Sequence, residues 1–209
     1  MTALRVRILA YDGVEALDFA GPFEVFTTAS RVSQRMQPGT AAPFDVASVA
    51  LAPPGQSVQA RAGLQLLADH TLASNPATDV LIVPGGVVDA PMASPETLRW
   101  IAACAAGAQV VASVCTGVFL LAKSGVVTQE AVTTHWEDIA DLRAQFPKLD
   151  VRDDVRWVDT GRIVSSAGIS AGIDMSLHLV ERLAGRALAE RTARQMDYAW
   201  THNSSHPSA

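Results

Sequence analysis

The chain has 209 residues, of which 49% are hydrophobic and 18% are charged. This length fits one compact domain, and so apolar a composition excludes disorder over the bulk of the chain. The 16 basic and 21 acidic residues give a net charge of −5, which does not favour binding to nucleic acid. Two cysteines are too few for a fold that depends on several disulfides.

The first ten residues do not read as a signal peptide, because their apolar run is short and is interrupted by Arg5 and Arg7. No stretch of about 18 apolar residues occurs, so no membrane partner is expected. These features favour a cytoplasmic protein with reduced thiols. We expect residues 1–201 to form a single domain and the polar residues 202–209 to form a flexible tail.

Short strand-like runs alternate with longer helical runs in the first half of the chain. Residues 4–10 alternate apolar side chains at period two and predict a strand, as do residues 44–51. Between them, Gly21 and Pro22 predict the start of a helix over 23–29, since proline fits the first helical position. Residues 58–68 predict an extended excursion.

Two continuous apolar runs, 79–83 and 109–114, are typical of parallel strands covered on both faces. Thr134 and Glu137 have capping-box spacing, which predicts a helix over 134–146. The other expected elements are helices over 95–106, 117–123, 170–183 and 187–200 and a hairpin joining 155–158 to 163–166. This alternation predicts an α/β fold with a doubly wound, mostly parallel sheet flanked by helices.

Cys115 stands where a buried strand is expected to run directly into a helix. This is the position of a nucleophile elbow, and Gly117 would permit the sharp turn. The helix N-terminus favours thiolate, so the sequence predicts a lowered pKa for Cys115. Cysteine is also a common small core residue, and we assign that role to Cys104 inside a helix. The surroundings of Cys115 favour a nucleophile over packing.

Asp18 is the candidate acid–base partner, because it follows the first strand at the same sheet edge as Cys115. Its apolar neighbours Leu17 and Phe19 predict partial burial, which would raise its pKa and keep it protonated. A protonated acid can donate to a thiolate. The residues alone leave open a surface or helix-capping aspartate, and Glu15 is a rival acid.

Gly85 and Gly86 follow the apolar strand and Pro84, so their backbone N–H groups lie at the same edge. Together with the Thr116 N–H they could form an anion or oxyanion site, and an ordinary strand-exit turn is the alternative. His135 is the one histidine within a distinctive segment. A structural role at a helix start is favoured for it, and lining the pocket is the alternative. No histidine pair has convincing zinc-ligand spacing, so no metal is expected.

Together these segments resemble the ThiJ/PfpI superfamily, whose fold is a three-layer α/β sandwich of the class I glutamine amidotransferase-like, flavodoxin-like kind. The branch they resemble contains isocyanide hydratases and the sensor-like domains of certain AraC-type regulators. The segments that carry the resemblance are residues 17–22, 84–86, 113–117, 133–136 and 168–174.

The resemblance implies Cys115 as the nucleophile, Asp18 as its acid–base partner and Thr116 as a hydrogen-bonding residue near the thiolate. Leu17, Gly85 and Gly86 would bind substrate. It further implies a homodimer that hydrates a small-molecule isocyanide to an N-formamide without metal or organic cofactor.

Some residues of this chain differ from those of other branches of the superfamily, and these differences narrow the expected activity. Protease-like members place a histidine where this chain has Thr116, and glyoxal-processing members use glutamate where it has Asp18. The regulators carry a further helix-turn-helix module, so nucleic acid is not an expected partner here. A glyoxalase-like enzyme and a non-enzymatic redox or ligand sensor remain the alternative functions.

Overall fold

The computed structural model describes residues 2–74 and 76–202. The tail expected at 202–209 therefore lies, apart from His202, outside the described residues. Among the residues described, no helix is both long and apolar enough to cross a membrane.

A seven-stranded sheet forms the centre of the molecule, in the order β10-β11-β7-β6-β1-β2-β5. Six of these strands run parallel, and only β10 pairs antiparallel with its neighbour β11. The predicted mostly parallel α/β sheet is confirmed. The strands are β1 (Leu4–Ala10), β2 (Phe44–Ala50), β5 (His70–Thr71), β6 (Val80–Val83), β7 (Val110–Val114), β10 (Trp157–Asp159) and β11 (Ile163–Ser166).

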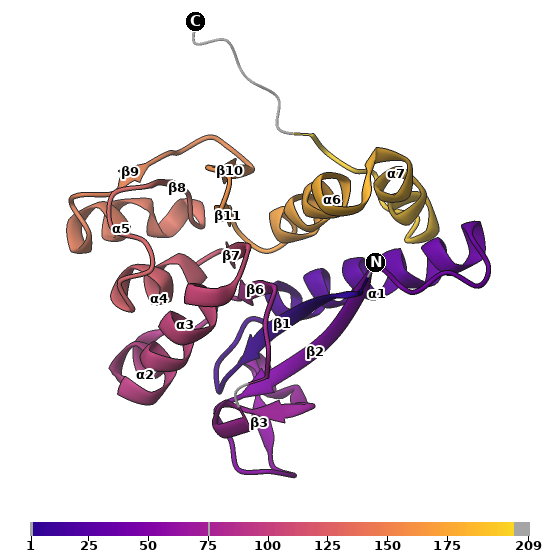
Figure 1. Cartoon of the computed structure of the whole chain (residues 1–209). Coiled ribbons are helices and arrows are strands. Elements are labelled where there is room, and N and C mark those ends of the chain that lie inside the picture. The colour runs from indigo at the N-terminus through magenta and orange to yellow at the C-terminus, as the bar shows by residue number, and fades with distance from the viewer. Residues whose placement is uncertain (1, 75, 203–209) are drawn as a thin grey trace, which may run out of the picture.

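Helices cover both faces of this sheet (Figure 1). On one side α1 (Ala16–Met36), α6 (Ala171–Ala184) and α7 (Arg186–Gln195) pack together. The opposite side holds α2 (Asp89–Ala93), α3 (Pro95–Gly107) and α4 (Gly117–Lys123). The arrangement is the expected three-layer sandwich.

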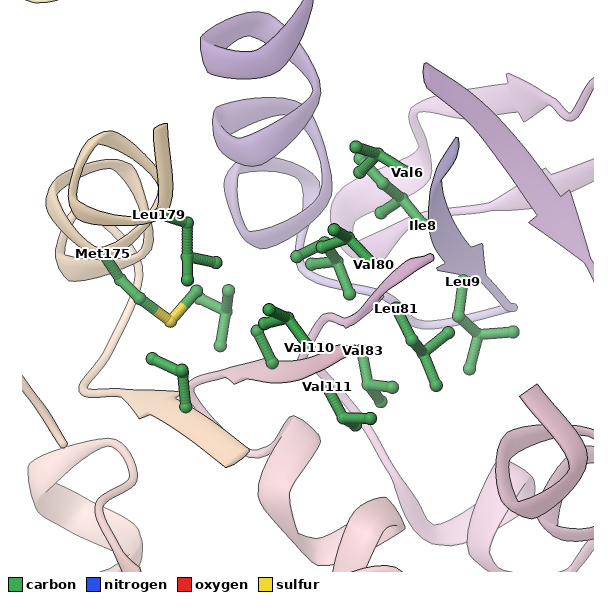
Figure 2. Packing of buried hydrophobic residues seen from close by; sticks show 14 of the residues in the cluster. Val6, Ile8, Leu9, Val80, Leu81, Val83, Val110, Val111, Met175 and Leu179 are labelled. Atoms are coloured by element: carbon green, nitrogen blue, oxygen red, sulfur yellow. The ribbon is translucent and has the colours of Figure 1, made fainter. Parts of the chain in front are cut away.

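The central strands are buried on both faces because nearly all their side chains are apolar. Every residue of β6 and β7 is buried. Figure 2 shows Val80 and Val110 pointing toward the α1 and α6 side, where Met175 and Leu179 meet them, while Val111 points the other way. These continuous apolar runs produce the two-sided core that the sequence predicted.

The carboxyl ends of β1, β6, β7 and β11 are brought to one edge by their register. In the β6–β7 pair, Val83 is opposite Ser113, and in the β11–β7 pair, Ser166 is opposite Val114. The loops that follow these strands therefore meet, as expected for ligand sites in open α/β sheets.

The first helix begins seven residues earlier than predicted. It runs from Ala16 to Met36 with Pro22 in its interior, and not from residue 23. Pro22 leaves the Asp18 carbonyl without its usual intrahelical donor. The buried face of the helix outweighs that loss, because Val25 and Phe26 are completely enclosed.

The single helix predicted over 134–146 is also wrong. The chain forms β8 (Ala131–Val132), a 3-10 turn η3 (Trp136–Asp138) and a short α5 (Ile139–Gln145), while β9 (Asp150–Val151) pairs with β8. Thr134 does not cap a helix, since its hydroxyl donates to the Cys115 carbonyl at 2.9 Å. A tertiary hydrogen bond has replaced the local cap.

The extended excursion predicted over 58–68 forms a small hairpin. Strand β3 (Ser57–Gln59) pairs antiparallel with β4 (Gln65–Leu67) around η1 (Arg61–Gly63), and η2 (Leu72–Ser74) follows β5. The Gly13 N–H donates to the Gln59 carbonyl at 2.8 Å. This bond ties the hairpin to the loop after β1.

Candidate active site

Cys115 lies on a strained turn between β7 and α4. Its φ angle is +54°, in the left-handed region that non-glycine residues rarely occupy. Gly117 makes the turn possible, because a Cβ there would collide with the Val83 carbonyl oxygen and lie 3.0 Å from the Pro84 carbonyl carbon. The geometry is that of a nucleophile elbow pressed against β6.

Backbone and side-chain hydrogen bonds hold the elbow in this conformation. The Cys115 N–H donates to the Ser166 carbonyl at 3.2 Å, and the Thr134 hydroxyl donates to the Cys115 carbonyl. The backbone N–H groups of Thr116 and Ile169 donate to the sulfur. Two amides thus point at the atom that would carry negative charge in a thiolate.

Asp18 is completely buried in the first turn of α1. Its Oδ2 accepts the Gly85 N–H at 3.2 Å, and its carboxylate hydrogen-bonds Cys115. The buried Oδ1 has no hydrogen-bond partner among the described residues. A carboxyl group with one unpaired oxygen next to a thiol can accept a proton from that thiol or donate one to it.

Burial raises the pKa of Asp18 to about 7, with a smaller contribution from the nearby Glu15 charge. The expected direction is confirmed. The pKa of Cys115 is raised to about 12, first by burial and then by the negative charge of Asp18. The lowered pKa expected for this thiol is therefore wrong, because the side chain is only 8% exposed and its desolvation outweighs the amide donors.

These two pKa values belong to a coupled pair that shares one proton over a wide pH range. Above about pH 7 the pair carries one negative charge, located on sulfur or on oxygen. Near neutral pH the sulfur therefore becomes anionic only when Asp18 takes the proton from Cys115.

Gly85, Gly86 and Thr116 form one hydrogen-bonded unit beside this pair. The Gly86 N–H donates to the Thr116 hydroxyl at 2.9 Å, and that hydroxyl donates to the Gly86 carbonyl at 3.0 Å. A Cβ on Gly85 would lie 2.6 Å from the Thr116 nitrogen and 2.9 Å from the Asp18 Oδ2. Both glycine amides already have protein acceptors, so the N–H groups expected to bind an oxyanion instead position Asp18 and Thr116 here.

Leu17 and His135 lie next to the pair in sequence or space. Leu17 precedes Asp18 and is 40% exposed. The His135 Nδ1 accepts the Glu137 N–H at 3.4 Å, which caps η3, and the ring packs where a Cβ of Gly168 would fall. The His135 side chain thus caps η3, and its part in lining the site stays a prediction.

Three site residues escaped the sequence reasoning. The Tyr11 hydroxyl donates to the Pro84 carbonyl at 2.9 Å, and burial, followed by the charges of Asp18 and Cys115, raises the pKa of Tyr11. Ile169 contributes its amide, and Thr134 its hydroxyl. Ile169 lies in the segment 168–174 that carried the family resemblance, which was the available signal for it.

No group of three or more histidine, cysteine or acidic side chains in the described parts of the chain is arranged to hold a metal ion. Neither cysteine forms a disulfide, and Cys104 is buried in α3 as expected for a packing residue.

Comparison with known proteins identifies the family to which this arrangement belongs. The model of the DJ-1/PfpI family matches residues 4–182. The chain belongs to the DJ-1/PfpI family. This assignment agrees with the resemblance read from the motifs, since DJ-1/PfpI and ThiJ/PfpI denote the same family.

Among curated DJ-1/PfpI relatives, the isonitrile hydratase of Pseudomonas putida is 33% identical over 198 residues, covering 94% of this chain and 79% of the hydratase. The transcriptional regulator GbdR of Pseudomonas aeruginosa is 32% identical over 149 residues. That match covers 71% of this chain but only 40% of the regulator.

Among solved structures, a ThiJ/PfpI family protein from Pseudomonas syringae superposes with a TM-score of 0.81. It is 26% identical, and the match covers 100% of this chain and 80% of that chain. DJ-1beta of Drosophila melanogaster superposes with a TM-score of 0.79 at 22% identity over 95% of this chain and all of the fly protein, which shows the shared fold.

Proposed function

We propose that this chain is a cysteine-dependent hydratase that converts isocyanides into N-substituted formamides. The observation that carries the proposal is the hydrogen-bonded pair of Cys115 and Asp18 at the strained elbow. The similarity to an isonitrile hydratase over 94% of the chain supports the choice of substrate. The wider family match alone would leave the substrate open.

In the first step the Cys115 sulfur attacks the terminal carbon of the isocyanide. Asp18 accepts the thiol proton as the carbon–sulfur bond forms, and then delivers it to the same carbon, which gives a thioimidate. A base with a pKa of about 7 is well matched to this transfer near neutral pH.

In the second step water adds to the thioimidate carbon with Asp18 as the base. Asp18 passes the proton taken from that water to the imidate nitrogen, which becomes the formamide N–H. The carbon–sulfur bond then breaks, the sulfur recovers the remaining hydroxyl proton as the C=O bond forms, and the N-formamide leaves. One water is consumed and no electrons are exchanged, so the proposed steps balance with Cys115, Asp18 and water alone.

The neighbouring residues have supporting parts in this proposal. The Thr116 and Ile169 amides stabilise the sulfur when it is anionic, while the Thr116 hydroxyl and Gly86 fix the elbow against the loop after β6. Gly85 holds Asp18 in place, and Leu17 contacts the substrate at the mouth of the site.

The test is turnover of a neutral isocyanide, such as cyclohexyl isocyanide, followed by formamide formation. We expect turnover in the wild-type protein and in Cys104→Ala, the matched control that removes the other thiol, and none in Cys115→Ala. Equal formamide formation with Cys115→Ala would reject Cys115 as the nucleophile.

A second candidate is a ligand-binding sensor, favoured by the similarity to the regulator GbdR. Binding of a small molecule near Cys115 without turnover of isocyanides or methylglyoxal would favour this function. Turnover of methylglyoxal to lactate alone would favour a glyoxalase-like enzyme instead.

We further propose that the protein acts as a homodimer in the cytoplasm. Leu64 and Leu67 on the small hairpin are 54% and 68% exposed, and a partner copy would cover them. The nucleophile needs a free thiol, which a reducing compartment maintains. Light scattering at micromolar concentration tests the dimer, and a monomeric mass would contradict it.

A further inference from the structure

Carboxylates gather around Cys115 from two segments that are distant in sequence. Glu15 and Asp18 come from the start of α1, where the Glu15 N–H donates to the Gly85 carbonyl at 2.8 Å. Asp138 belongs to η3, which begins two residues after Thr134, whose hydroxyl donates to the Cys115 carbonyl. Both segments are therefore anchored directly on the site.

The partners of these carboxylates neutralise them only in part. Arg61 lies 3.8 Å from Glu15 and is 65% exposed, so solvent screens this pair. The His135 Nδ1 lies 3.5 Å from the Asp138 Oδ2, and one imidazole faces both Asp138 and Glu137. The surroundings of the elbow consequently carry net negative charge.

The field of these groups reaches the reacting atoms. The charges of Asp18 and Asp138 both raise the pKa of Cys115, and the charge of Glu15 raises the pKa of Asp18. A negatively charged substrate would meet the same repulsion as it approached the sulfur.

Large apolar side chains stand exposed beside the same groups. Leu17 precedes Asp18, Val87 follows the two glycines, and Ile169 carries an amide that bonds the sulfur. These three are 40%, 48% and 39% exposed, and Trp136 next to His135 is 75% exposed. Apolar surface with negative charge behind it suits an uncharged or cationic molecule that has an apolar substituent.

We propose that the Cys115 site selects neutral or cationic apolar electrophiles and rejects anionic ones, with Asp138 and Glu15 as the residues that set this charge selection. This proposal takes from the proposed function only the reacting group, which is an isocyanide; the charge preference does not depend on it. Neutral alkyl and aryl isocyanides are then substrates, and isocyanides that carry a carboxylate are not.

The experiment compares alkylation of Cys115 by iodoacetamide and by iodoacetate, which have the same leaving group and differ in charge. A Cys104→Ala background leaves one thiol, and mass spectrometry gives both rate constants. The reference is the ratio of the same two rate constants for 2-mercaptoethanol. At low salt we expect the protein ratio to exceed the reference about tenfold in favour of iodoacetamide.

Removing the charge should remove the preference. Asp138→Asn and Glu15→Gln should each lower the ratio about two- to threefold. The matched control Glu190→Gln, on α7 beyond the far end of α6, should leave it unchanged. Raising the ionic strength to 0.5 M should lower it without any substitution. A wild-type ratio equal to the reference, or one insensitive both to salt and to Asp138→Asn, would overturn the proposal.

A parallel assay of cyclohexyl isocyanide against isocyanoacetate separates the two hypotheses. Charge-selective alkylation without turnover of either isocyanide would reject the hydratase and leave the selection standing. Equal turnover of both isocyanides would reject the selection and leave the hydratase standing.

Discussion

At the scale of single residues, the site depends on one shared proton. Burial and the negative charge of Asp18 raise the pKa of Cys115 to about 12, so a thiol in this place is not ionised at neutral pH unless its proton moves to Asp18. In the proposed mechanism Asp18, with a pKa of about 7, is the base that makes the sulfur reactive. The elbow supplies geometry, and the buried carboxylate supplies the base.

The pH dependence of turnover should follow Asp18. We expect kcat/KM for a neutral isocyanide to rise with pH through about 7, as Asp18 becomes able to accept the thiol proton. In Asp18→Asn turnover should fall at least about 100-fold, the usual contribution of a positioned acid–base group. A pH profile that is flat between 5.5 and 8.5 in the wild-type protein would contradict this role.

The same carboxyl should make stability depend on pH. Its pKa is raised from 3.8 to about 7 on folding, so its contribution to stability is complete below about pH 4 and is lost as pH rises through 7. Asp18→Asn removes this loss. Relative to the wild-type protein, the variant should gain up to about 4 kcal/mol in free energy of unfolding between pH 4 and pH 8.

Urea unfolding at both pH values measures this difference, because the remaining groups titrate alike in the two proteins. A difference between variant and wild type that does not change with pH would mean that Asp18 titrates normally in the folded state.

At the scale of elements, the turn between β7 and α4 is the part of the fold with least freedom. Gly117→Ala places a methyl group against the carbonyl of Val83, the last residue of the neighbouring strand β6. We expect a loss of about 1–3 kcal/mol in the free energy of unfolding, as for other overpacked sites, together with loss of turnover.

Gly107→Ala is the matched control for that substitution. A Cβ on Gly107, the last residue of α3, meets nothing within 4 Å. This variant should be neutral or more stable by about 0.5–1 kcal/mol, since alanine suits a helix better than glycine. Equal stability of the two variants in urea unfolding would show that the tight approach at Gly117 is unimportant.

The sequence predicted these elements well where local pattern and burial agree. The strands β6 and β7 were predicted correctly because both of their faces are covered, which leaves a continuous apolar run in the sequence. The start of α4 at Gly117 was also predicted correctly. The start of α1 was missed because the proline rule is local, while the helix is stabilised by distant packing. The role of Thr134 was missed because its partner, the Cys115 carbonyl, lies 19 residues away.

The site was predictable in its side chains and not in its backbone. Cys115 and Asp18 carry functional groups that a sequence displays. The Ile169 amide depends on a loop conformation, with φ of +49°, that no residue type announces. The thiol pKa was mispredicted because the helix N-terminus is visible in sequence, while the extent of burial is not.

At the scale of the whole molecule, the chain beyond α7 returns to the end of α6 that adjoins the site. The completely buried Asp174 binds Arg156, and it also accepts the Thr201 N–H at 2.8 Å. The Trp200 indole donates to the Asp174 carbonyl at 3.3 Å. One carboxylate thus joins α6, the segment before β10 and the last described residues.

Asp174→Ala should consequently destabilise the protein by about 2–4 kcal/mol, because it leaves Arg156 without this partner in a partly buried place. The Arg156 side chain is 35% exposed, which tempers the loss. The matched control Asp150→Ala breaks the exposed pair with Arg152 and should cost less than about 1 kcal/mol. Indistinguishable urea midpoints for the two variants would contradict this ranking.

The most direct test of the central claim is formamide production from cyclohexyl isocyanide, followed by NMR in parallel for wild type, Cys115→Ala and Asp18→Asn. The account predicts one N-cyclohexylformamide for each isocyanide consumed by the wild-type protein. It predicts no enzymatic product with Cys115→Ala and at least about 100-fold slower formation with Asp18→Asn, in which Cys115 stays open to alkylation. Folded wild-type protein that gives no formamide although its Cys115 can be alkylated, or undiminished product with either variant, would contradict it.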